Sequence, residues 1–247
     1  MPRMPTTLEA GSDAACLCVY DPLAVPEGLA EAQGKRRNRF IAEFTANQRA
    51  WLLRTGGDGE FFVRFYVDEN VPAEQLRHVV GKPANARLIL ESDQLCVTGI
   101  EDVRRPIPGP DGTDPTLPAL SLPRGTYEMS AWTLRWPEDV IAASYEQRAI
   151  AEFGADRWAG YRKRSRFDSA LSIALLLGGA FCFFATLTKT GRNYFGWQGL
   201  VGLWAPWLVA IQVIPRLRRE PDGERVAQLT RETQSEYPDY ILHLRRL

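Results

Sequence analysis

The sequence predicts a mainly β protein: a cytoplasmic β-sandwich or partly closed β-barrel domain, followed by a two-helix transmembrane hairpin. Three observations lead to this class. Segments 60–68 and 125–136 alternate side chains as strands do, with one wholly apolar face in the first and bulky residues on both faces of the second. Helical patterns are few before residue 137, which disfavours a parallel α/β sheet. Segments 169–188 and 193–215 contain no charged residue, and each is long enough to cross a bilayer as a helix.

The first part of the chain is expected to begin without structure. Residues 1–14 are rich in small and polar side chains, so we expect them to be disordered. A cytoplasmic β-rich domain should follow over residues 15–156, with its first strand at 16–20. Segment 40–53 contains two apolar patches, and its class stays open between helix and strand.

The clearest strand comes next. A glycine-rich turn at 55–59 precedes segment 60–68, whose apolar face consists of Phe61, Val63, Phe65 and Val67. Segments 86–90 and 94–98 are predicted to form a hairpin. Segment 106–118 contains five prolines and two glycines, which predicts a long surface loop. A helix should start near Pro137, since proline and acidic residues favour the first helical turn.

The charges beside the two uncharged segments predict a membrane orientation. The connection between the segments carries Lys189 and Arg192, whereas more cations lie on the outer flanks. The predicted membrane-flanking residues are Arg157, Arg162, Lys163, Arg164, Arg166, Arg216, Arg218 and Arg219. The positive-inside rule then predicts a multi-pass protein of the bacterial inner (cytoplasmic) membrane with both termini cytoplasmic. Trp158 and Tyr161 would be interface aromatics at the inner boundary.

This placement completes the expected domain organisation. Residues 157–219 would form the basic flanks and the transmembrane hairpin, and residues 220–247 a cytoplasmic tail. Ala174 and Gly178 are four residues apart and could let a second helix approach closely. That helix could be the other span of the hairpin or a span of a second copy, so a homo-oligomer stays open.

The charge distribution indicates which partners the domain could bind. Residues 1–156 carry 16 Lys and Arg against 23 Asp and Glu, whereas residues 157–247 carry 14 against 7. An acidic domain does not suit nucleic acid, because neutralising phosphates requires a basic surface. We therefore expect the lipid bilayer and an unknown, basic protein as partners, and no nucleic acid.

Motifs for catalysis or cofactor binding are missing from the sequence. It contains two histidines, His78 and His243, without zinc spacing or a neighbouring nucleophile motif, and no Walker-type glycine loop. Cys16 and Cys18 could bind a metal, but two packed core thiols explain them more simply. We expect no cofactor, no metal and no catalytic residue. Acidic residues near predicted strand ends leave calcium binding open as an alternative; they are Asp21, Asp58, Asp68, Asp93, Asp111 and Asp114.

These inferences predict a non-enzymatic, inner-membrane-anchored protein whose cytoplasmic β-rich domain binds a protein partner. An immunity or accessory role in a bacterial toxin or secretion system would suit such a plan. Asp111 and Asp114 of the proline-rich loop are the predicted partner-binding residues. The alternatives are a membrane-tethered hydrolase that depends on carboxylates and a calcium- or lipid-sensing domain.

Overall fold

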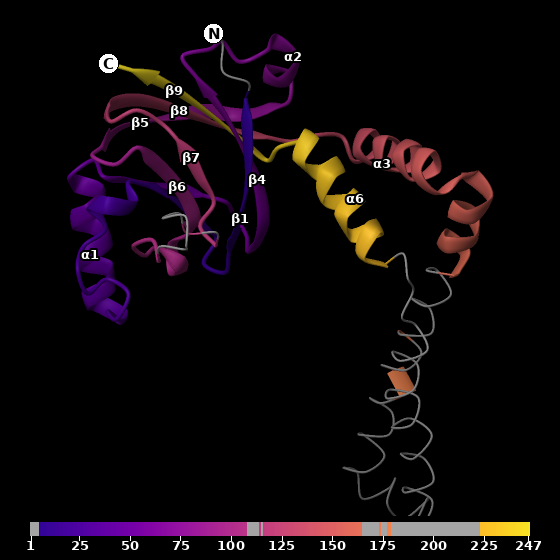
Figure 1. Cartoon of the computed structure of the whole chain (residues 1–247), viewed down its shortest axis with the longest axis horizontal. Coiled ribbons are helices and arrows are strands. Elements are labelled where there is room, and N and C mark those ends of the chain that lie inside the picture. Colours follow the sequence, from indigo (N-terminus) through magenta and orange to yellow (C-terminus); the bar gives the residue numbers. More distant parts are fainter. Residues whose placement is uncertain (1–4, 108–113, 115, 165–172, 174–176, 179–222) are drawn as a thin grey trace, which may run out of the picture. The chain divides into compact units, whose positions relative to one another are not determined.

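The computed structural model describes residues 5–107, 114, 116–164, 173, 177–178 and 223–247. The chain divides into two compact units, Met1–Ile141 with Glu232–Leu247, and Ala142–Arg231. The first unit contains two β-sheets, and the described part of the second consists of helices (Figure 1).

The larger sheet of the first unit has five strands in the order β1-β4-β9-β8-β5. Their bounds are Thr6–Ser12 for β1, Gly59–Val67 for β4, Tyr240–Arg246 for β9, Gly125–Leu134 for β8 and Val79–Leu90 for β5. Neighbouring strands run antiparallel except β4 and β9, which are parallel with Phe65 opposite Leu242. The C-terminal strand therefore lies inside this sheet and links its two halves.

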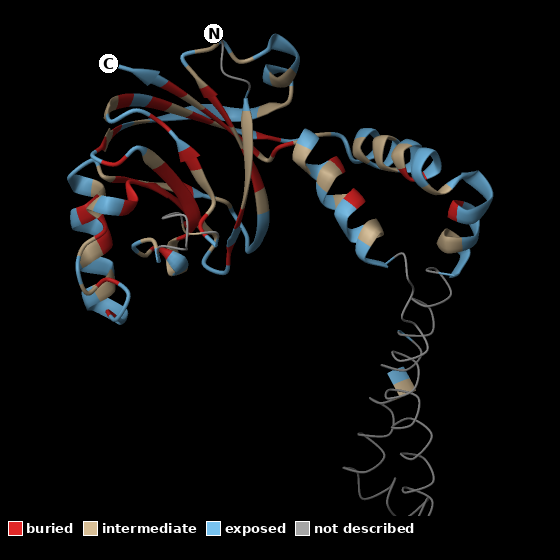
Figure 2. Cartoon of the chain, viewed as in Figure 1, coloured by how far each residue is buried: buried red, intermediate tan, exposed pale blue. Residues whose placement is uncertain are grey.

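The smaller sheet has four antiparallel strands in the order β3-β2-β6-β7. Their bounds are Ala50–Arg54 for β3, Cys16–Tyr20 for β2, Gln94–Gly99 for β6 and Ala119–Ser121 for β7. The two sheets pack face to face as a sandwich. Its main core contains Leu17, Val19 and Val97 from the smaller sheet and Val63, Phe65 and Leu242 from the larger one. Figure 2 shows the buried residues concentrated on these strands.

Helix α1 (Gly34–Ala46) covers the outer face of the smaller sheet. Its buried residues Ile41 and Phe44 pack in a second core with Cys18, Tyr20 and Cys96 of that sheet. A third, smaller core lies on the outer face of the larger sheet around Tyr66, Leu134 and Ile241. The remaining short helices of this unit are η1 (Pro22–Ala24), α2 (Ala73–Leu76) and η2 (Ile100–Asp102).

The second unit contains most of α3 (Glu138–Phe153), a helix over residues 155–164, and most of α6 (Gly223–Glu236). Ala149, Trp158 and Leu229 are its described buried core, one from each helix. Glu152 of α3 and Arg225 of α6 form an ion pair at 2.9 Å. The three helices therefore enclose a small core of their own.

The predicted fold class is wrong, because the chain is mixed α/β and not mainly β. In the part of the chain that the structure describes, no helix is long and apolar enough to cross a membrane. The predicted spans, 169–188 and 193–215, lie outside the described residues except for positions 173, 177 and 178. The transmembrane hairpin and the multi-pass inner-membrane placement with cytoplasmic termini are thus not supported. A long uncharged segment permits a span but does not require one.

Two further segments differ from the sequence-based expectations. Residues 6–12 lie in the segment expected to be disordered, yet they form β1 and pair with residues 59–65 of β4. Its polar sequence is compatible with a strand because β1 is an edge strand, with only Ala10 and Ser12 buried. The segment 220–247, expected to be a cytoplasmic tail, contributes β9 to the sheet between β4 and β8. Tyr240, Ile241, Leu242 and Leu244 of β9 are fully buried or nearly so.

Candidate functional site

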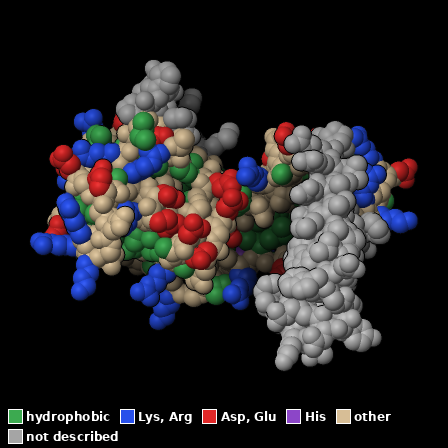
Figure 3. Space-filling view, turned by 90° about the horizontal axis from the view of Figure 1, so that it is seen from below, with side chains coloured by type: hydrophobic (Ala, Val, Ile, Leu, Met, Phe, Trp, Pro, Cys, Tyr) green, Lys and Arg blue, Asp and Glu red, His purple; other side chains and the backbone are tan. Residues whose placement is uncertain are grey.

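Three connections meet at one end of the sandwich, and each carries carboxylates. Ser12 of β1 lies opposite Gly59 of β4, and Leu17 of β2 lies opposite Gly99 of β6, so the β1–β2 turn, the β3–β4 turn and η2 are neighbours. We call this end the acidic end and define it by Asp13, Asp58, Glu60, Glu101 and Asp102. Figure 3, which views the molecule from below, shows acidic side chains gathered on this side.

Hydrogen bonds fix the three connections relative to one another. The backbone N–H of Asp13 donates to Glu101 Oε1 at 2.5 Å, and that of Ala15 donates to Asp58 Oδ1 at 3.0 Å. Arg37 of α1 donates from Nη2 to the carbonyl oxygens of Ile100 and Glu101, at 2.8 and 2.7 Å. Asp58 and Glu101 therefore serve partly as structural ties, whereas the exposed carboxylates of Asp13 and Asp102 are positioned by the backbone around them.

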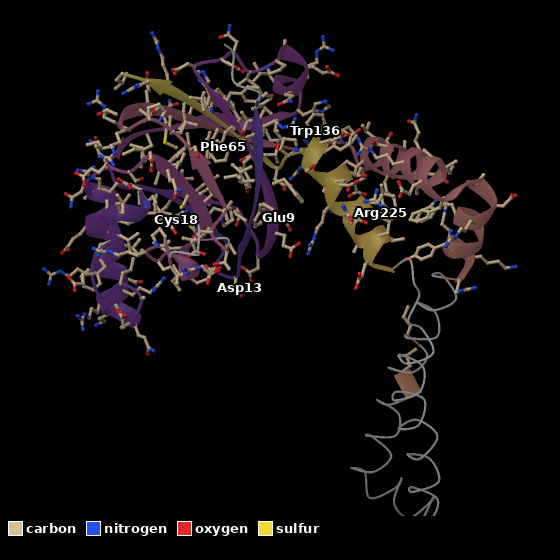
Figure 4. All side chains as sticks on the ribbon, in the orientation of Figure 1. Glu9, Asp13, Cys18, Phe65, Trp136 and Arg225 are labelled. Atoms are coloured by element: carbon tan, nitrogen blue, oxygen red, sulfur yellow. The ribbon has the colours of Figure 1, made fainter. Side chains whose placement is uncertain are left out.

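A groove of about 290 Å³ adjoins the acidic end. It is lined by residues 9–11 of β1, by Thr98 and Gly99 of β6, and by Asp102, Arg104 and residues 116–118 of the β6–β7 connection. Figure 4 labels Glu9 and Asp13 beside this region. The groove thus has carboxylates at its sides and strand backbone along its length, which suits a polar or cationic group of a partner.

Gly99 sets how closely β6 approaches β1. A Cβ atom at this position would lie 2.7 Å from the Gly11 carbonyl oxygen and would also collide with the Glu101 carboxylate. We predict that Gly99→Ala lowers the free energy of unfolding by about 1–3 kcal/mol, since a clash with backbone forces the strands apart. Urea denaturation measures this change. Gly57→Ala is the matched control, because nothing lies within 4 Å of its Cβ position, and an equal loss in both variants would contradict the prediction.

Asp114, one of the two predicted partner-binding residues, connects described residues on both sides of the proline-rich segment. Its Oδ2 accepts from Arg104 Nη1 at 2.7 Å and from the Ile107 N–H at 2.8 Å. Its Oδ1 accepts from the hydroxyl and the N–H of Thr116 at 2.6 and 2.9 Å. These bonds, led by the Thr116 hydroxyl, hold the pKa of Asp114 well below its ordinary value. Asp111 lies outside the described residues.

The predicted membrane-flanking cations are only partly described. Arg157, Arg162, Lys163 and Arg164 lie in the helix over residues 155–164, and Arg162 forms an ion pair with Glu146 of α3. Arg166, Arg216, Arg218 and Arg219 lie outside the described residues.

The two histidines are half-buried beside tryptophan rings, and the thiols of Cys18 and Cys96 lie in the second core. His78 stacks on Trp136 with ring centroids 4.1 Å apart, and His243 lies beside Trp132 at 6.3 Å. Burial raises the pKa of Cys96 to about 12 and raises the pKa of Cys18 above its ordinary value. Both thiols therefore stay protonated near neutral pH, although the thiolate is the form that attacks or binds metal.

The acidic residues considered for calcium lie at both ends of the sandwich. Asp21, Asp68 and Asp93 lie at the end where β2 and β4 finish and β6 begins, whereas Asp58 lies at the opposite end. Among the described residues, no group of three or more Asp, Glu, His or Cys is arranged to hold a metal ion. The sequence did not single out Asp13, Glu60, Glu101 or Asp102, because only the fold brings them together.

The first unit is thus a two-sheet sandwich with an acidic end, a class of domain that many functions share. No family model matches the chain, and no curated protein matches it. Among solved structures it is similar to "Crocagin biosynthetic gene J", with 16% identity, 53% of this chain and 75% of that one covered, and a TM-score of 0.37. It is also similar to ComJ from Bacillus subtilis, described as an inhibitor of the DNA-degrading activity of NucA, with 12% identity, coverage of 54% and 84%, and a TM-score of 0.33. At TM-scores below 0.5, these likenesses carry no argument about function.

Proposed function

We propose that this protein acts by contact: the acidic end of the sandwich binds a protein partner with a basic surface. The observation that carries the proposal is the meeting of five carboxylates on three connections and the start of β4, which hydrogen bonds hold in place; they are Asp13, Asp58, Glu60, Glu101 and Asp102. Asp58 and Glu101 accept hydrogen bonds that tie the connections together, but gathering five carboxylates at one place is electrostatically unfavourable because like charges repel one another. It does favour a partner of opposite charge.

The position of the array supports a contact role. Asp13 and Asp102 are exposed, and Asp102 lines the groove beside β1. Arg104, the basic residue of the groove, is already paired with Asp114, so it does not neutralise the neighbouring carboxylates fully. Charges of this kind mainly raise the association rate and select against acidic partners. Their effect decays over about 10 Å at 0.1 M salt.

Charge reversal at the acidic end tests this function. We predict that Asp13→Lys with Asp102→Lys weakens capture of the partner at least about tenfold, because like charges then oppose each other across the interface. The full chain would be used as bait, the partner identified by mass spectrometry, and its Kd measured by biolayer interferometry at two salt concentrations. Wild-type association should slow as salt rises, and that of the double variant should change less.

The matched control reverses two charges elsewhere on the same unit. Glu74→Lys with Asp93→Lys makes the same change in net charge at exposed residues far from the acidic end in sequence and fold. Its Kd should stay within about twofold of wild type. Equal weakening by both double variants would mean that net charge alone matters. Unchanged capture by the acidic-end variant would contradict the proposal.

A further inference from the structure

The larger sheet of the sandwich has two edge strands, and one of them is protected against further pairing. Strand β5 contains Lys82 and Pro83, and its pairing with β8 is interrupted between Val80 and Ala84. Lysine, proline and bulges are features that keep an edge strand from pairing with another chain. Strand β5 is therefore an unsuitable edge for an added strand.

Strand β1, the other edge, has none of these features. It contains no lysine and no proline, and Thr6–Ser12 pair with β4 in one continuous register. Of the strands that the structure describes, only β4 pairs with β1. A regular edge of this kind is a template for an added strand, and many proteins bind extended peptides in this way.

Gly11 indicates which backbone groups of β1 face the open side. Its carbonyl oxygen would lie 2.7 Å from a Cβ atom on Gly99 of β6, so it points toward the other sheet and not toward β4. In an antiparallel pair, alternate residues direct their N–H and C=O groups toward the partner strand, and the residues between direct theirs away. Thr7 belongs to the same alternate set as Gly11, so its backbone groups also point away from β4.

The groove beside the acidic end adjoins this edge. Residues 9–11 of β1 form one side of it, and Thr98, Gly99 and residues 116–118 lie on the other. Its volume of about 290 Å³ is at the lower limit of small-molecule sites, which hold about 300–1,000 Å³. The groove therefore suits one long side chain of a bound segment better than a separate ligand.

Charge indicates which segment would pair here. Asp102 lines the groove and Asp13 directly follows β1; both are exposed, and neither side chain forms an ion pair with a residue that the structure describes. Arg104, which also lines the groove, is paired with Asp114 at 2.7 Å and donates to the hydroxyl of Thr116. The edge therefore favours a cationic segment, because an acidic one would bring like charges together.

We propose that β1 pairs with an extended, basic segment of the protein partner, which adds one strand to the larger sheet. Main-chain hydrogen bonds on the open side of β1 would hold the segment, and a lysine or arginine side chain would enter the groove toward Asp102. This inference rests on the proposed function, since the acidic end supplies the charge that favours the segment. It adds the form of the contact, namely a strand and not a folded basic surface.

Backbone methylation of a peptide probe separates pairing from charge. The probe is an end-capped, eight-residue peptide of alternating arginine and valine, whose Kd for the full chain is measured by isothermal titration calorimetry. Two further versions carry N-methyl groups on the arginines or on the valines, so each loses the N–H groups of one edge and keeps the charge. Because one edge of the segment pairs with β1, one version should bind at least about tenfold more weakly and the other within about twofold of the parent.

Two substitutions at one position test the same edge on the protein. Thr7→Pro removes the N–H that faces away from β4, and we expect it to weaken binding of the parent peptide at least about fivefold. Thr7→Val is the matched control, because it keeps this N–H and removes the hydroxyl that accepts from Arg64 Nε. Its Kd should stay within about twofold of wild type. Thermal melting shows whether both variants stay folded, and the methylated peptides test the wild-type chain if Thr7→Pro does not.

The outcomes distinguish this inference from the proposed function. Equal Kd values for both methylated peptides, or wild-type binding by folded Thr7→Pro, would overturn strand addition; if Asp13→Lys with Asp102→Lys still weakens binding, the proposed function stands. Methylation-sensitive binding that survives this charge reversal would contradict the proposed function instead. Absence of binding by the parent peptide would overturn strand addition. So would a dimer in analytical ultracentrifugation that Thr7→Pro dissociates, because a second copy would then occupy the edge.

Discussion

Replacing Phe65 by aspartate should leave the first unit unfolded at room temperature. Phe65 lies on β4 in the main core, is 1% exposed, and sits opposite Leu242 of β9 and Thr6 of β1. Truncating a buried phenylalanine costs about 3–5 kcal/mol, and an unpaired carboxylate in the same place adds the cost of burying a charge. Domains of this size are stable by only about 5–15 kcal/mol.

Graded variants make this prediction quantitative. Phe65→Ala should fold but lose about 3–5 kcal/mol in urea denaturation. Phe65→Asp should lose the near-ultraviolet circular dichroism signal of packed aromatics without urea. Leu76→Asp is the control. Because Leu76 lies in α2 and is 41% exposed, this substitution should lower the free energy of unfolding by less than about 1 kcal/mol. A cooperative, wild-type-like transition for Phe65→Asp would show that this face of β4 does not form the core.

Alternation predicted the positions of two long strands. Segment 60–68 matches β4, and segment 125–136 covers β8. Segment 40–53 stayed undecided for a physical reason: it contains the end of α1 and the start of β3, and the chain reverses between them with Gln48 at φ +58°. A single period cannot describe a window that contains two elements.

No local sequence pattern predicts which strands pair when they are far apart in the sequence. Strand β9 joins β4 in parallel, and the Phe62 N–H donates to Asp239 Oδ2 across 177 positions of sequence. The short, apolar segment 240–244 alone indicates that the end of the chain packs somewhere, but not against which strand. Strand β1 is polar because it is an edge, so its sequence resembles that of an unstructured terminus.

The sequence predicted the charge of the candidate site but not which residues form it. Net negative charge over residues 1–156 indicated a basic partner, but acidic residues occur throughout that segment. Asp13 and Glu101 are 88 positions apart, and the hydrogen bond between them depends on how the two sheets pack. Trp158 and Tyr161 were expected to be membrane-interface aromatics. In the structure they stack on each other in a helical core.

Removing the carboxylate of Asp21 should destabilise the first unit nearly as much as truncating a core side chain. Asp21 is 0% exposed at the end of β2. Its Oδ1 accepts from the Leu23 N–H at 3.1 Å and caps η1. Its Oδ2 accepts from the Glu91 N–H at 2.6 Å and, more weakly, from the Ser92 N–H at 3.4 Å. The side chain therefore connects β2, η1 and the β5–β6 turn.

Asp21→Ala would leave these backbone donors without acceptors in a site that excludes water. Each unsatisfied buried group costs about 1–3 kcal/mol, so we expect a total loss of about 3–5 kcal/mol in urea denaturation. The stability of Asp21→Asn should lie between that of Asp21→Ala and that of wild type. The single carbonyl oxygen of asparagine can accept the hydrogen bonds on one side of the junction, but its NH₂ group would face backbone N–H donors on the other side. Hydrogen exchange should quicken first at Leu23 and Glu91, whose N–H groups lose their acceptor.

Asp93→Ala provides the comparison, since Asp93 is an exposed aspartate in the same β5–β6 turn. Removing a solvated carboxylate should change stability by less than about 0.5 kcal/mol. A similar small effect for Asp21→Ala would mean that water replaces the carboxylate at the junction. A large loss confined to Asp21 would show that one buried carboxylate, in a segment whose sequence predicts only a turn, joins the two sheets of the sandwich at this end.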